Sequence, residues 1–465
     1  MSDDAPYDVV IVGGGASGTA LLYALARYTS VGRIALFEKH AEFGAVNSRA
    51  NNNSQTLHIG DIETNYSVDK VKEVAPAASM VAQYARALPE AVRAKILFPI
   101  YKMVLGVGAE EVAQLDDRFE KIKNIFPDLR KLDRAEIEKV EPMVVRGRSE
   151  KEPIVALAQW GYAVDYQRLA QSFVKETLAR ADAQERVKIF LKSPVFDATR
   201  EKDGIWKIVH AQGSVRARVV IFDADAYSLS FAKRLGYGKE FSLIPVAGTF
   251  FFSKQFLQGK VYTVQNPRLP FASVHGDPDV RVHGKTRWGP TARFFPVLEA
   301  RNWNTARDYF SVSGLHRLRT WKSFGVIILD PLRFWYLVRN ILYEIPLLAP
   351  YFFARQVRKI VPSVSGRDFT RAHGFGGMRL QRVNTDTHEL LLGEGKIIGD
   401  NIIFNMTPSP GTSVCLHNAV RDIEHIMRFL GTPNSFDTTL LRKELCGGHA
   451  SASTDDLSLS TSYAS

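Results

Sequence analysis

Cysteine is scarce in this chain, which holds only Cys415 and Cys446 among its 465 residues. So few thiols exclude a disulfide scaffold and a cysteine-rich zinc site, and they are typical of a reducing compartment. We therefore expect no bound metal.

Long hydrophobic runs are also absent. The longest uncharged stretch of the most apolar region, residues 345–354, covers about ten residues, whereas a membrane-spanning helix needs about twenty. The first six residues are acidic and lead directly into an apolar strand, without the basic and apolar regions of a secretory signal. We expect a cytoplasmic protein without a transmembrane helix.

The composition is that of a globular protein. Hydrophobic residues make up 45% and charged residues 23%, which excludes a fully disordered or fibrous chain. The length exceeds that of a typical domain of about 150 residues roughly threefold. A net charge of +11 and a pI of about 9.4 favour an anionic partner, which could be an acidic substrate, an anionic lipid surface or nucleic acid. No nucleic-acid-binding module is recognisable, so we expect no nucleic-acid partner.

The region from Phe324 to Phe353 combines large apolar residues at helical spacing with interspersed arginines, and Pro346 and Pro350 interrupt it. One interpretation is a pair of helices that face the core. The other is a peripheral patch that dips into an anionic membrane, with arginines at the level of the headgroups.

The N-terminal segment has the pattern of a dinucleotide-binding fold. Residues 7–12 form an apolar, β-branched strand, and Gly13, Gly15 and Gly18 of a G-x-G-x-x-G turn lead from it into a helix. The pyrophosphate is expected at the positive end of that helix. A second strand, 33–38, ends in Glu38, which is placed to bind a ribose. Ser17 and Lys39 are assigned to the same cofactor site.

Segment 51–66 resembles the flavin-proximal loop of malate:quinone oxidoreductases and, more loosely, that of L-2-hydroxyglutarate dehydrogenases. Further segments resemble family motifs in the same order, so that the resemblance spans roughly residues 7–430: 161–166, 273–277, 288–290, 377–381 and 409–413. It implies an FAD enzyme of the glutathione-reductase-like kind that oxidises a 2-hydroxy acid, in the first place L-malate to oxaloacetate, and reduces a membrane quinone. It also implies peripheral attachment to the membrane.

The expected fold is α/β, with a Rossmann-type FAD-binding domain interleaved with an α+β substrate domain that carries a mixed or antiparallel sheet. We assign 1–80, 150–235 and 375–432 to the FAD-binding domain and 81–149 and 236–374 to the substrate domain. Residues 433–465 form a C-terminal extension that is expected to be flexible at its end.

Two segments are expected to surround the flavin ring. The loop 51–58 offers amides and hydroxyls that can bind ring edges without adding charge, and its assigned residues are Asn53, Ser54, Thr56 and His58. The strand 401–406 leads into a helix whose start at Pro410, Gly411, Thr412 and Ser413 would stabilise negative charge on the reduced flavin.

On the substrate side, hydride transfer from a hydroxy acid requires a base, a cation for the carboxylate and exclusion of water. The resemblance selects His275 as the base, and Asp277 would lie on the same face of a strand and orient it. Arg379 is the expected carboxylate clamp. The alternatives for a second anchor are Arg293, His373 and Arg382.

One departure from the usual flavoprotein pattern concerns the strand 219–224. Asp225 occupies the place of a glycine near the cofactor, so its carboxylate is expected to point away from the phosphates or to bind the backbone.

Proteins with other functions can share this fold, which leaves three alternatives: a disulfide reductase, an enzyme for another substrate and a non-catalytic protein. The chain lacks a second G-x-G-x-x-G and a C-x-x-x-x-C pair, which argues against a pyridine-nucleotide disulfide reductase. The substrate could instead be L-2-hydroxyglutarate or an amino acid, as the segment 377–381 suggests. A third possibility is a non-catalytic flavin-binding protein at a membrane.

Overall fold

The computed structural model describes residues 5–266, 269, 273–345, 347–391, 393–407 and 411–446. The assigned Pro410 and the expected flexible end, 447–465, lie outside the described residues.

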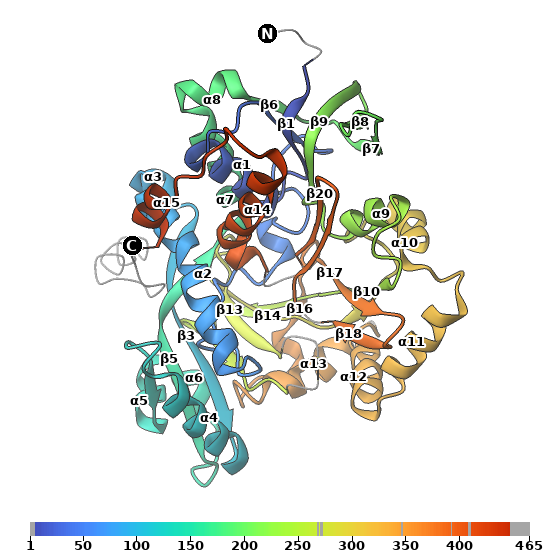
Figure 1. Ribbon diagram of the computed structural model, residues 1–465. Coiled ribbons are helices and arrows are strands. Elements are labelled where there is room, and N and C mark those ends of the chain that lie inside the picture. Colours follow the sequence, from blue (N-terminus) through green and yellow to red (C-terminus); the bar gives the residue numbers. More distant parts are fainter. Residues whose placement is uncertain are drawn as a thin grey trace.

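An eight-stranded sheet forms the upper part of the molecule in Figure 1. Its central strands run parallel in the order β20, β9, β1, β2, β6. Strand β19 pairs antiparallel with β20, and strand β8 pairs antiparallel with β9. The strands are β1 (Tyr7–Val12), β2 (Ile34–Phe37), β6 (Val187–Phe190), β7 (Val195–Arg200), β8 (Trp206–His210), β9 (Gly213–Phe222), β19 (Gly395–Gly399) and β20 (Ile402–Met406).

Both faces of this sheet are buried, as expected for parallel strands made of continuous apolar runs. One face packs against three helices, α1 (Ala16–Tyr28), α7 (Tyr166–Leu178) and α14 (Cys415–Leu430), with Val9 and Ile11 in the shared core. The other face packs beneath α9 (Ala226–Arg234), where Phe222 stacks against Phe231.

A second eight-stranded sheet lies below the first in Figure 1 and is mostly antiparallel. Its order is β16, β11, β14, β13, β12, β3, β5, β4, and only β12 and β3 run parallel. The strands are β3 (Leu97–Val107), β4 (Arg130–Leu132), β5 (Ile154–Val164), β11 (Phe251–Lys254), β12 (Lys260–Thr263), β13 (His275–Pro278), β14 (Lys285–Gly289) and β16 (Thr370–Arg371).

A four-stranded antiparallel sheet in the order β15, β10, β17, β18 completes the sheet structure. Its strands are β10 (Phe241–Ala247), β15 (Arg293–Phe294), β17 (Met378–Asn384) and β18 (Glu389–Leu391). Register pairs Ala247 with both Arg293 and Met378, which brings three distant segments together beside the second sheet.

The remaining helices cover the sheets. They are α2 (Val68–Ala87), α3 (Glu90–Arg93), α4 (Ala109–Ile122), α5 (Arg134–Val140), α6 (Pro142–Val145), α8 (Ala181–Arg186), α10 (Ala306–Ser313), α11 (Leu318–Ile328), α12 (Pro331–Leu342), α13 (Ala349–Val357) and α15 (Thr438–Leu445). Among the described residues, no helix combines the length and the apolar character needed to cross a bilayer.

The expected fold class is confirmed: a Rossmann-type sheet accompanies mixed and antiparallel sheets. All strands of the first sheet come from the three ranges assigned to the cofactor domain. However, β5 and β17, which lie in the same ranges, pair in the other two sheets, so the exact division into domains stays a prediction.

Candidate active site

The glycine turn between β1 and α1 is built as its sequence predicts. Gly13 has a φ of +122°, and its N–H donates to the carbonyl of Phe37 at 2.8 Å. A Cβ on Gly18 would lie 2.0 Å from the Gly13 carbonyl oxygen, so a larger residue cannot replace it without moving the backbone. Gly15 is the N-cap of α1 and makes no side-chain cap hydrogen bond, and the positive end of a helix at this point favours an anion.

Glu38 lies directly beside this turn. Its carboxylate accepts the N–H of Gly14 at 2.7 Å and that of His40 at 2.8 Å, which fixes it where a ribose would be bound. Lys39, assigned to the same site, is engaged elsewhere: its ammonium pairs with Glu299 and lies 4.0 Å from the centre of the Tyr227 ring. The assignment of Lys39 to the cofactor is therefore not supported.

Two adjoining cavities lead away from the glycine turn. The smaller has a volume of about 220 Å³ and begins at Ser17, in the first turn of α1. The larger has a volume of about 530 Å³ and shares Glu394, Asn418 and Arg421 with the smaller one. The result is a continuous path from the dinucleotide turn to the strand that carries Arg379, which suits an extended dinucleotide.

The residues along this path fit FAD. The first sheet supplies the pyrophosphate turn, and the path ends in a cavity large enough for a ring system and a small substrate. The side chains of Asn418 and Glu394 lie beside each other where the two cavities meet and add polar groups to the path. A Cβ on Gly377 would lie 2.2 Å from the carbonyl oxygen of Asn52, so the two walls meet closely at this point.

The loop 51–58 contributes Asn53, Ser54 and His58 to the lining of the larger cavity. Thr56, also assigned to the cofactor, is buried behind the lining and bonds the hydroxyl of Tyr262 at 2.7 Å. Thr56 holds the loop on β12 and does not line the cavity, so its assignment to the cofactor stays a prediction that this contact does not support.

Buried cations hold this loop from behind, which sequence reasoning missed. Lys260 donates to the carbonyl of Ser54 at 3.1 Å, and Arg287 donates to the same carbonyl at 3.0 Å. Lys102 donates to the carbonyl of Leu57 at 3.3 Å. All three side chains are fully buried and paired with aspartates, so the loop is fixed by charge-assisted hydrogen bonds.

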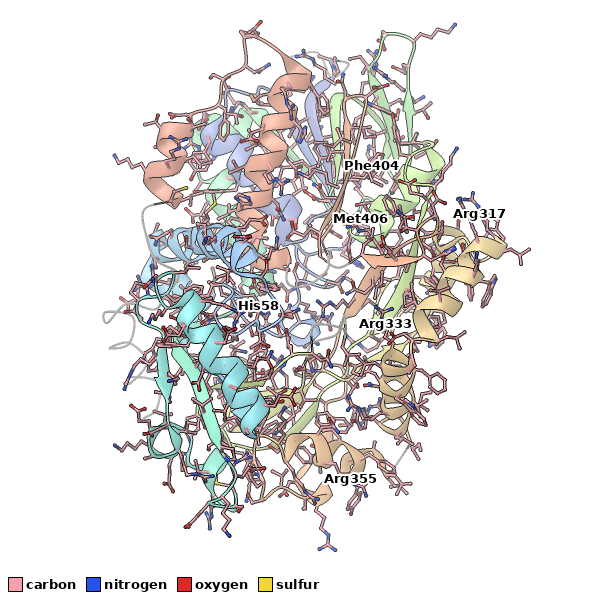
Figure 2. The ribbon with its side chains drawn as sticks, turned by 60° about the horizontal axis from the view of Figure 1, so that its bottom comes forward. His58, Arg317, Arg333, Arg355, Phe404 and Met406 are labelled. Atoms are coloured by element: carbon pink, nitrogen blue, oxygen red, sulfur yellow. The ribbon has the colours of Figure 1, made fainter. Side chains whose placement is uncertain are left out.

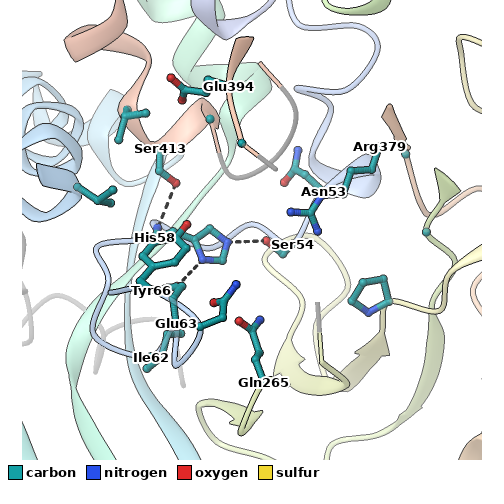
Figure 3. A pocket seen from close by; sticks show the side chains of 18 of the residues that line it. Asn53, Ser54, His58, Ile62, Glu63, Tyr66, Gln265, Arg379, Glu394 and Ser413 are labelled. Carbon is teal, nitrogen blue, oxygen red and sulfur yellow. Dashed lines mark hydrogen bonds and ion pairs between the residues drawn. The ribbon is translucent and has the colours of Figure 1, made fainter. Parts of the chain in front are cut away.

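His58 and Glu63 form a close pair in the cavity (Figure 3). The Nδ1 of His58 lies 2.5 Å from Oε1 of Glu63, and its Nε2 lies 3.2 Å from the hydroxyl of Ser54. The backbone N–H of His58 donates to Ser413 at 3.1 Å. Burial raises the pKa of Glu63, but the hydrogen bond and charge of His58 outweigh it and lower that pKa overall. Glu63 thus remains ionised and orients the imidazole.

His275 lies on β13 and lines the same cavity. Its Nδ1 donates to the carbonyl of Ser273 at 3.2 Å, its ring stacks on Tyr262 at 4.2 Å, and its Nε2 has no partner among the described residues. Burial lowers the pKa of His275 to about 3, even though Asp277 raises it. The imidazole is therefore neutral and presents a free lone pair.

Asp277 lies on the same face of β13 as expected, but it serves other partners. Its Oδ2 accepts from Lys260 and from Arg287, each at 3.0 Å, whereas its Oδ1 is 3.8 Å from Nε2 of His275. This separation is too long for a hydrogen bond. Asp277 thus anchors the buried cations, and the hydrogen bond that would orient His275 is absent.

Arg379, at the start of β17, is the cation that the cavity offers to an acid (Figure 3). Its Nε is buried without a hydrogen-bond partner among the described residues, and no described carboxylate pairs with it. Burial lowers the pKa of Arg379, and Tyr66 and Tyr336 lie close enough to raise it in part. A desolvated, unpaired guanidinium is a strong receptor for a substrate carboxylate.

The three alternative anchors do not line either cavity. Arg293, on the edge strand β15, pairs with Glu344 at 2.9 Å. His373 is exposed in a loop. Arg382 is buried against Gly395 and donates to the carbonyl of Glu394 at 2.8 Å. The structure brings none of the three into the lining of the described cavities, so a second anchor is not found among them.

The expected helix start after β20 differs in detail. Residues Gly411–Val414 form a 3₁₀ turn, and α14 begins only at Cys415. Gly411 and Ser413 line the larger cavity as assigned, but Thr412 does not. Ser413 accepts from His58 and bonds the hydroxyl of Tyr166 at 2.9 Å, so this turn closes on the loop 51–58.

Asp225 adopts a conformation that glycine would prefer, with a φ of +50° and a ψ of −119°. Such a conformation costs on the order of 1–3 kcal/mol for another residue. Its carboxylate accepts a hydrogen bond from the side chain of Asn47 at 3.0 Å. The sequence led us to expect a carboxylate that points away from the phosphates or binds the backbone. Burial raises the pKa of Asp225 from 3.8 to about 6.

The raised pKa of Asp225 predicts a pH-dependent stability. Because the folded-state pKa lies above the unfolded value, the charged form is disfavoured in the native protein, and stability is lost as pH rises from about 4 to 6. The shift corresponds to about 3 kcal/mol. Asp225→Asn should therefore raise the melting temperature by a few degrees at pH 8 and by less at pH 5, measured by thermal unfolding. Asp128→Asn, at an exposed loop, is the control; equal gains at both pH values would contradict this account.

Sequence reasoning also missed Glu63, Tyr66, Gln265 and Tyr336, which all line the larger cavity. Tyr336 lies within the apolar region that was interpreted as core helix or membrane patch, and no local pattern separates it from its neighbours. Glu63 follows His58 by five residues in a loop. Neither a helix nor a strand places side chains at that spacing on the same face.

Comparisons with known proteins agree with this geometry. The family model for malate:quinone oxidoreductase matches residues 5–301. The chain is 37% identical to malate:quinone oxidoreductase of Helicobacter pylori (strain 26695), over 94% of this chain and 98% of that protein. It is 25% identical to the mitochondrial L-2-hydroxyglutarate dehydrogenase of Caenorhabditis elegans, over 89% and 92% of the two chains.

Solved structures show the same fold. L-α-glycerophosphate oxidase from Mycoplasma pneumoniae with FAD bound has a TM-score of 0.59 at 18% identity, and covers 90% of this chain and 94% of its own. Glycine oxidase from Geobacillus kaustophilus has a TM-score of 0.59 at 17% identity, with 95% and 99% covered. The resemblance predicted from the sequence is confirmed. The chain belongs to the malate:quinone oxidoreductase family and is an FAD-dependent oxidoreductase.

Proposed function

We propose that this protein oxidises L-malate to oxaloacetate with FAD and transfers the electrons to a membrane quinone. The observation that carries the proposal is one cavity that holds both the His58–Glu63 pair and the unpaired guanidinium of Arg379. Family membership supports the same reaction. L-2-hydroxyglutarate is the second candidate substrate, supported by the more distant relative.

FAD would be held by Glu38 and the glycine turn at its adenosine end, and by Asn53, Ser54 and Ser413 at its ring. When bound, it accepts the hydride from the carbon that carries the substrate hydroxyl. The buried cations behind the loop 51–58 keep the ring-binding groups in place, so the geometry exists before substrate binds.

The base that takes the hydroxyl proton is His58 in this proposal. A base must gain a positive charge in a site from which water is largely excluded, and Glu63, 2.5 Å from Nδ1, offsets that charge. His275 faces the same cavity, but burial lowers its pKa to about 3, which makes it the weaker acceptor. Its neutral ring can still accept a hydrogen bond from the substrate.

The substrate carboxylate binds Arg379, whose guanidinium can form two parallel hydrogen bonds to it. Tyr66 and Gln265 line the cavity too and can donate to the second carboxylate of a dicarboxylic acid. A longer acid would have to displace one of these side chains.

The direct test is the flavin spectrum of the purified holoenzyme without oxygen. L-malate should bleach the oxidised flavin band within the turnover time, whereas L-2-hydroxyglutarate should act far more slowly. If L-2-hydroxyglutarate bleaches the band faster than L-malate, L-2-hydroxyglutarate is the substrate. A bound flavin that neither acid reduces would instead indicate a non-catalytic flavin-binding protein.

The membrane partner of the proposal is an anionic bilayer, which would be contacted by the helices α11–α13. These helices and the segments that join them carry large apolar side chains that are exposed by more than a third. The docking surface consists of Leu318, Trp321, Val326, Ile328, Leu329, Phe334, Trp335, Ile341, Ile345, Leu347, Leu348 and Tyr351. So many exposed large apolar residues mark an interaction site in a globular protein.

The charges around the docking surface favour anionic lipid over another apolar partner. Arg355 extends away from the body of the protein at one end of this region in Figure 2, and Arg339 and Lys322 are also exposed. Each basic residue near an anionic surface contributes about 1 kcal/mol to binding. Short amphipathic helices with this pattern lie in the membrane interface.

Replacing Phe334 and Trp335 by serine should weaken binding to vesicles that contain anionic lipid by at least ~10-fold, because both side chains are more than 40% exposed and would be inserted. Co-sedimentation with vesicles measures the effect. Phe196→Ser, on β7 and 54% exposed, is the matched control. If the double variant binds equally well, or if it loses only self-association, the docking surface faces something other than a bilayer.

A further inference from the structure

We propose that the quinone reaches the active-site cavity from the bilayer beside α12, and that Tyr336 is the residue of this helix that contacts its ring. This inference rests on the proposed function and on the docking surface, and it goes beyond both because it assigns a route and a contact residue for the electron acceptor.

The two faces of α12 carry the argument. Phe334, Trp335 and Ile341 are 42%, 66% and 64% exposed and belong to the docking surface. Tyr336 points the other way and lines the larger cavity. An α-helix with its side chains is about 10–12 Å across, so the cavity lies no more than about one helix diameter from the bilayer-facing surface.

The helix is joined directly to the cavity wall at its C-terminal half. The side-chain oxygen of Asn340 accepts the backbone N–H of Ala292 at 2.7 Å, and Ala292 itself lines the cavity. Just beyond the helix, Glu344 pairs with Arg293 at 2.9 Å. These contacts fix the register of α12, so that Tyr336 faces the cavity while Trp335 faces outward.

The cavity wall beside Tyr336 suits a quinone ring. Val246, Phe250, Pro290, Ala292 and Met378 line the cavity and are all apolar. A quinone combines a flat apolar ring with two carbonyl acceptors, and the hydroxyl of Tyr336 and the guanidinium of Arg379 are donors near enough to each other to interact electrostatically. A polar hydroxy acid makes little use of such a wall.

The electron balance needs no further reactant. Oxidation of the hydroxy acid to the oxo acid breaks one C–H and one O–H bond and releases two electrons and two protons. Reduction of the quinone to its quinol takes up two electrons and two protons. The enzyme thus returns to its starting state after each pair of half-reactions.

Photolabelling locates the quinone independently of activity. The holoenzyme, bound to anionic vesicles that contain a prenylated azidoquinone, is irradiated, and the labelled peptide is identified by mass spectrometry. We expect the label within residues 331–342 and its loss when excess unlabelled quinone is present. A label confined to a peptide outside α11–α13 and the cavity lining would overturn the proposal.

Kinetics of two variants separate this inference from the proposed function. Tyr336→Trp should slow reoxidation of the reduced enzyme by vesicle-embedded quinone at least ~10-fold more than it slows anaerobic reduction by L-malate, because the larger ring fills the wall on which the quinone would lie. Phe196→Trp, on the exposed β7 strand, is the control and should change neither rate. If Tyr336→Trp slows only reduction by malate, Tyr336 belongs to the acid site and the route is wrong. If malate fails to reduce even the unchanged enzyme, the proposed function fails, yet the photolabelling result still decides the quinone site.

Discussion

Replacing His58 by glutamine is expected to slow anaerobic flavin reduction by L-malate at least ~100-fold while FAD stays bound, because glutamine cannot take up the hydroxyl proton. Glutamine retains a hydrogen-bonding side chain of similar reach, so the contacts to Ser54 and Glu63 can persist in part. Stopped-flow absorbance of the flavin band measures the rate, and the visible spectrum and flavin content show whether the cofactor is retained.

The matched variant is His275→Gln in the same cavity. If His58 is the base, this variant loses less than ~10-fold, because His275 then supplies only a hydrogen bond. The opposite pattern, with a large loss for His275→Gln and a small one for His58→Gln, would assign the base to His275, as the sequence resemblance first suggested.

The pH profile separates the two histidines by a second route. A general base works in its deprotonated form, so the rate falls as pH decreases through its pKa. A base with a pKa of about 3, the value to which burial lowers that of His275, would give a flat profile from pH 9 down to pH 5. A rate that falls between pH 9 and pH 5 would therefore exclude His275 as the base.

The parts of the site that could be predicted from the sequence are local in the chain. The glycine turn, the following helix and Glu38 lie within about thirty residues, and their spacing alone requires the observed arrangement. Glycine at position 13 is needed because of its positive φ, which the pattern already implies. The order of the family motifs extended the prediction from the glycine turn to the flavin loop 51–58 and to Arg379.

The parts that could not be predicted depend on pairing between distant segments. Lys260 and Arg287 come from neighbouring regions of the second sheet, yet their charges are buried beneath Ser54, more than 200 residues away in sequence. No periodicity distinguishes a buried lysine on a strand from an exposed one. The same reason explains the assignment of Asp277: its face of the strand was predicted, but its partners were not.

The three alternative anchors, which lie outside the cavity lining, show a different limit. Arg293 follows a glycine–proline turn near the predicted histidine strand, which made it plausible as a ligand of the substrate. In the structure it pairs with Glu344 instead. Sequence proximity to a site therefore identified the correct region but not the direction of the side chain, which is set by sheet pairing.

Arg379 should be the residue whose loss most weakens substrate binding. Two charge-assisted hydrogen bonds to a carboxylate contribute about 1.5–3 kcal/mol each, so Arg379→Met should lower kcat/KM for L-malate by about 10²–10⁴-fold. Arg379→Lys keeps the charge but not the planar pair of donors, and it should recover only part of this loss. Arg200→Met, at an arginine on β7 that pairs with Asp400 and lies outside the cavity lining, is the control and should change kcat/KM less than ~3-fold.

A binding measurement distinguishes a lost anchor from a distorted fold. Titration of the oxidised holoenzyme with oxaloacetate perturbs the flavin spectrum and gives a Kd that does not depend on turnover. Since the guanidinium of Arg379 is buried without a carboxylate partner among the described residues, its removal should not destabilise the protein through a stranded negative charge. Arg379→Met should therefore retain its FAD and its melting temperature while the Kd for oxaloacetate rises at least ~100-fold. An unchanged Kd together with a reduced kcat would mean that Arg379 acts on the transition state or on the flavin, and that another group of the cavity holds the substrate carboxylate.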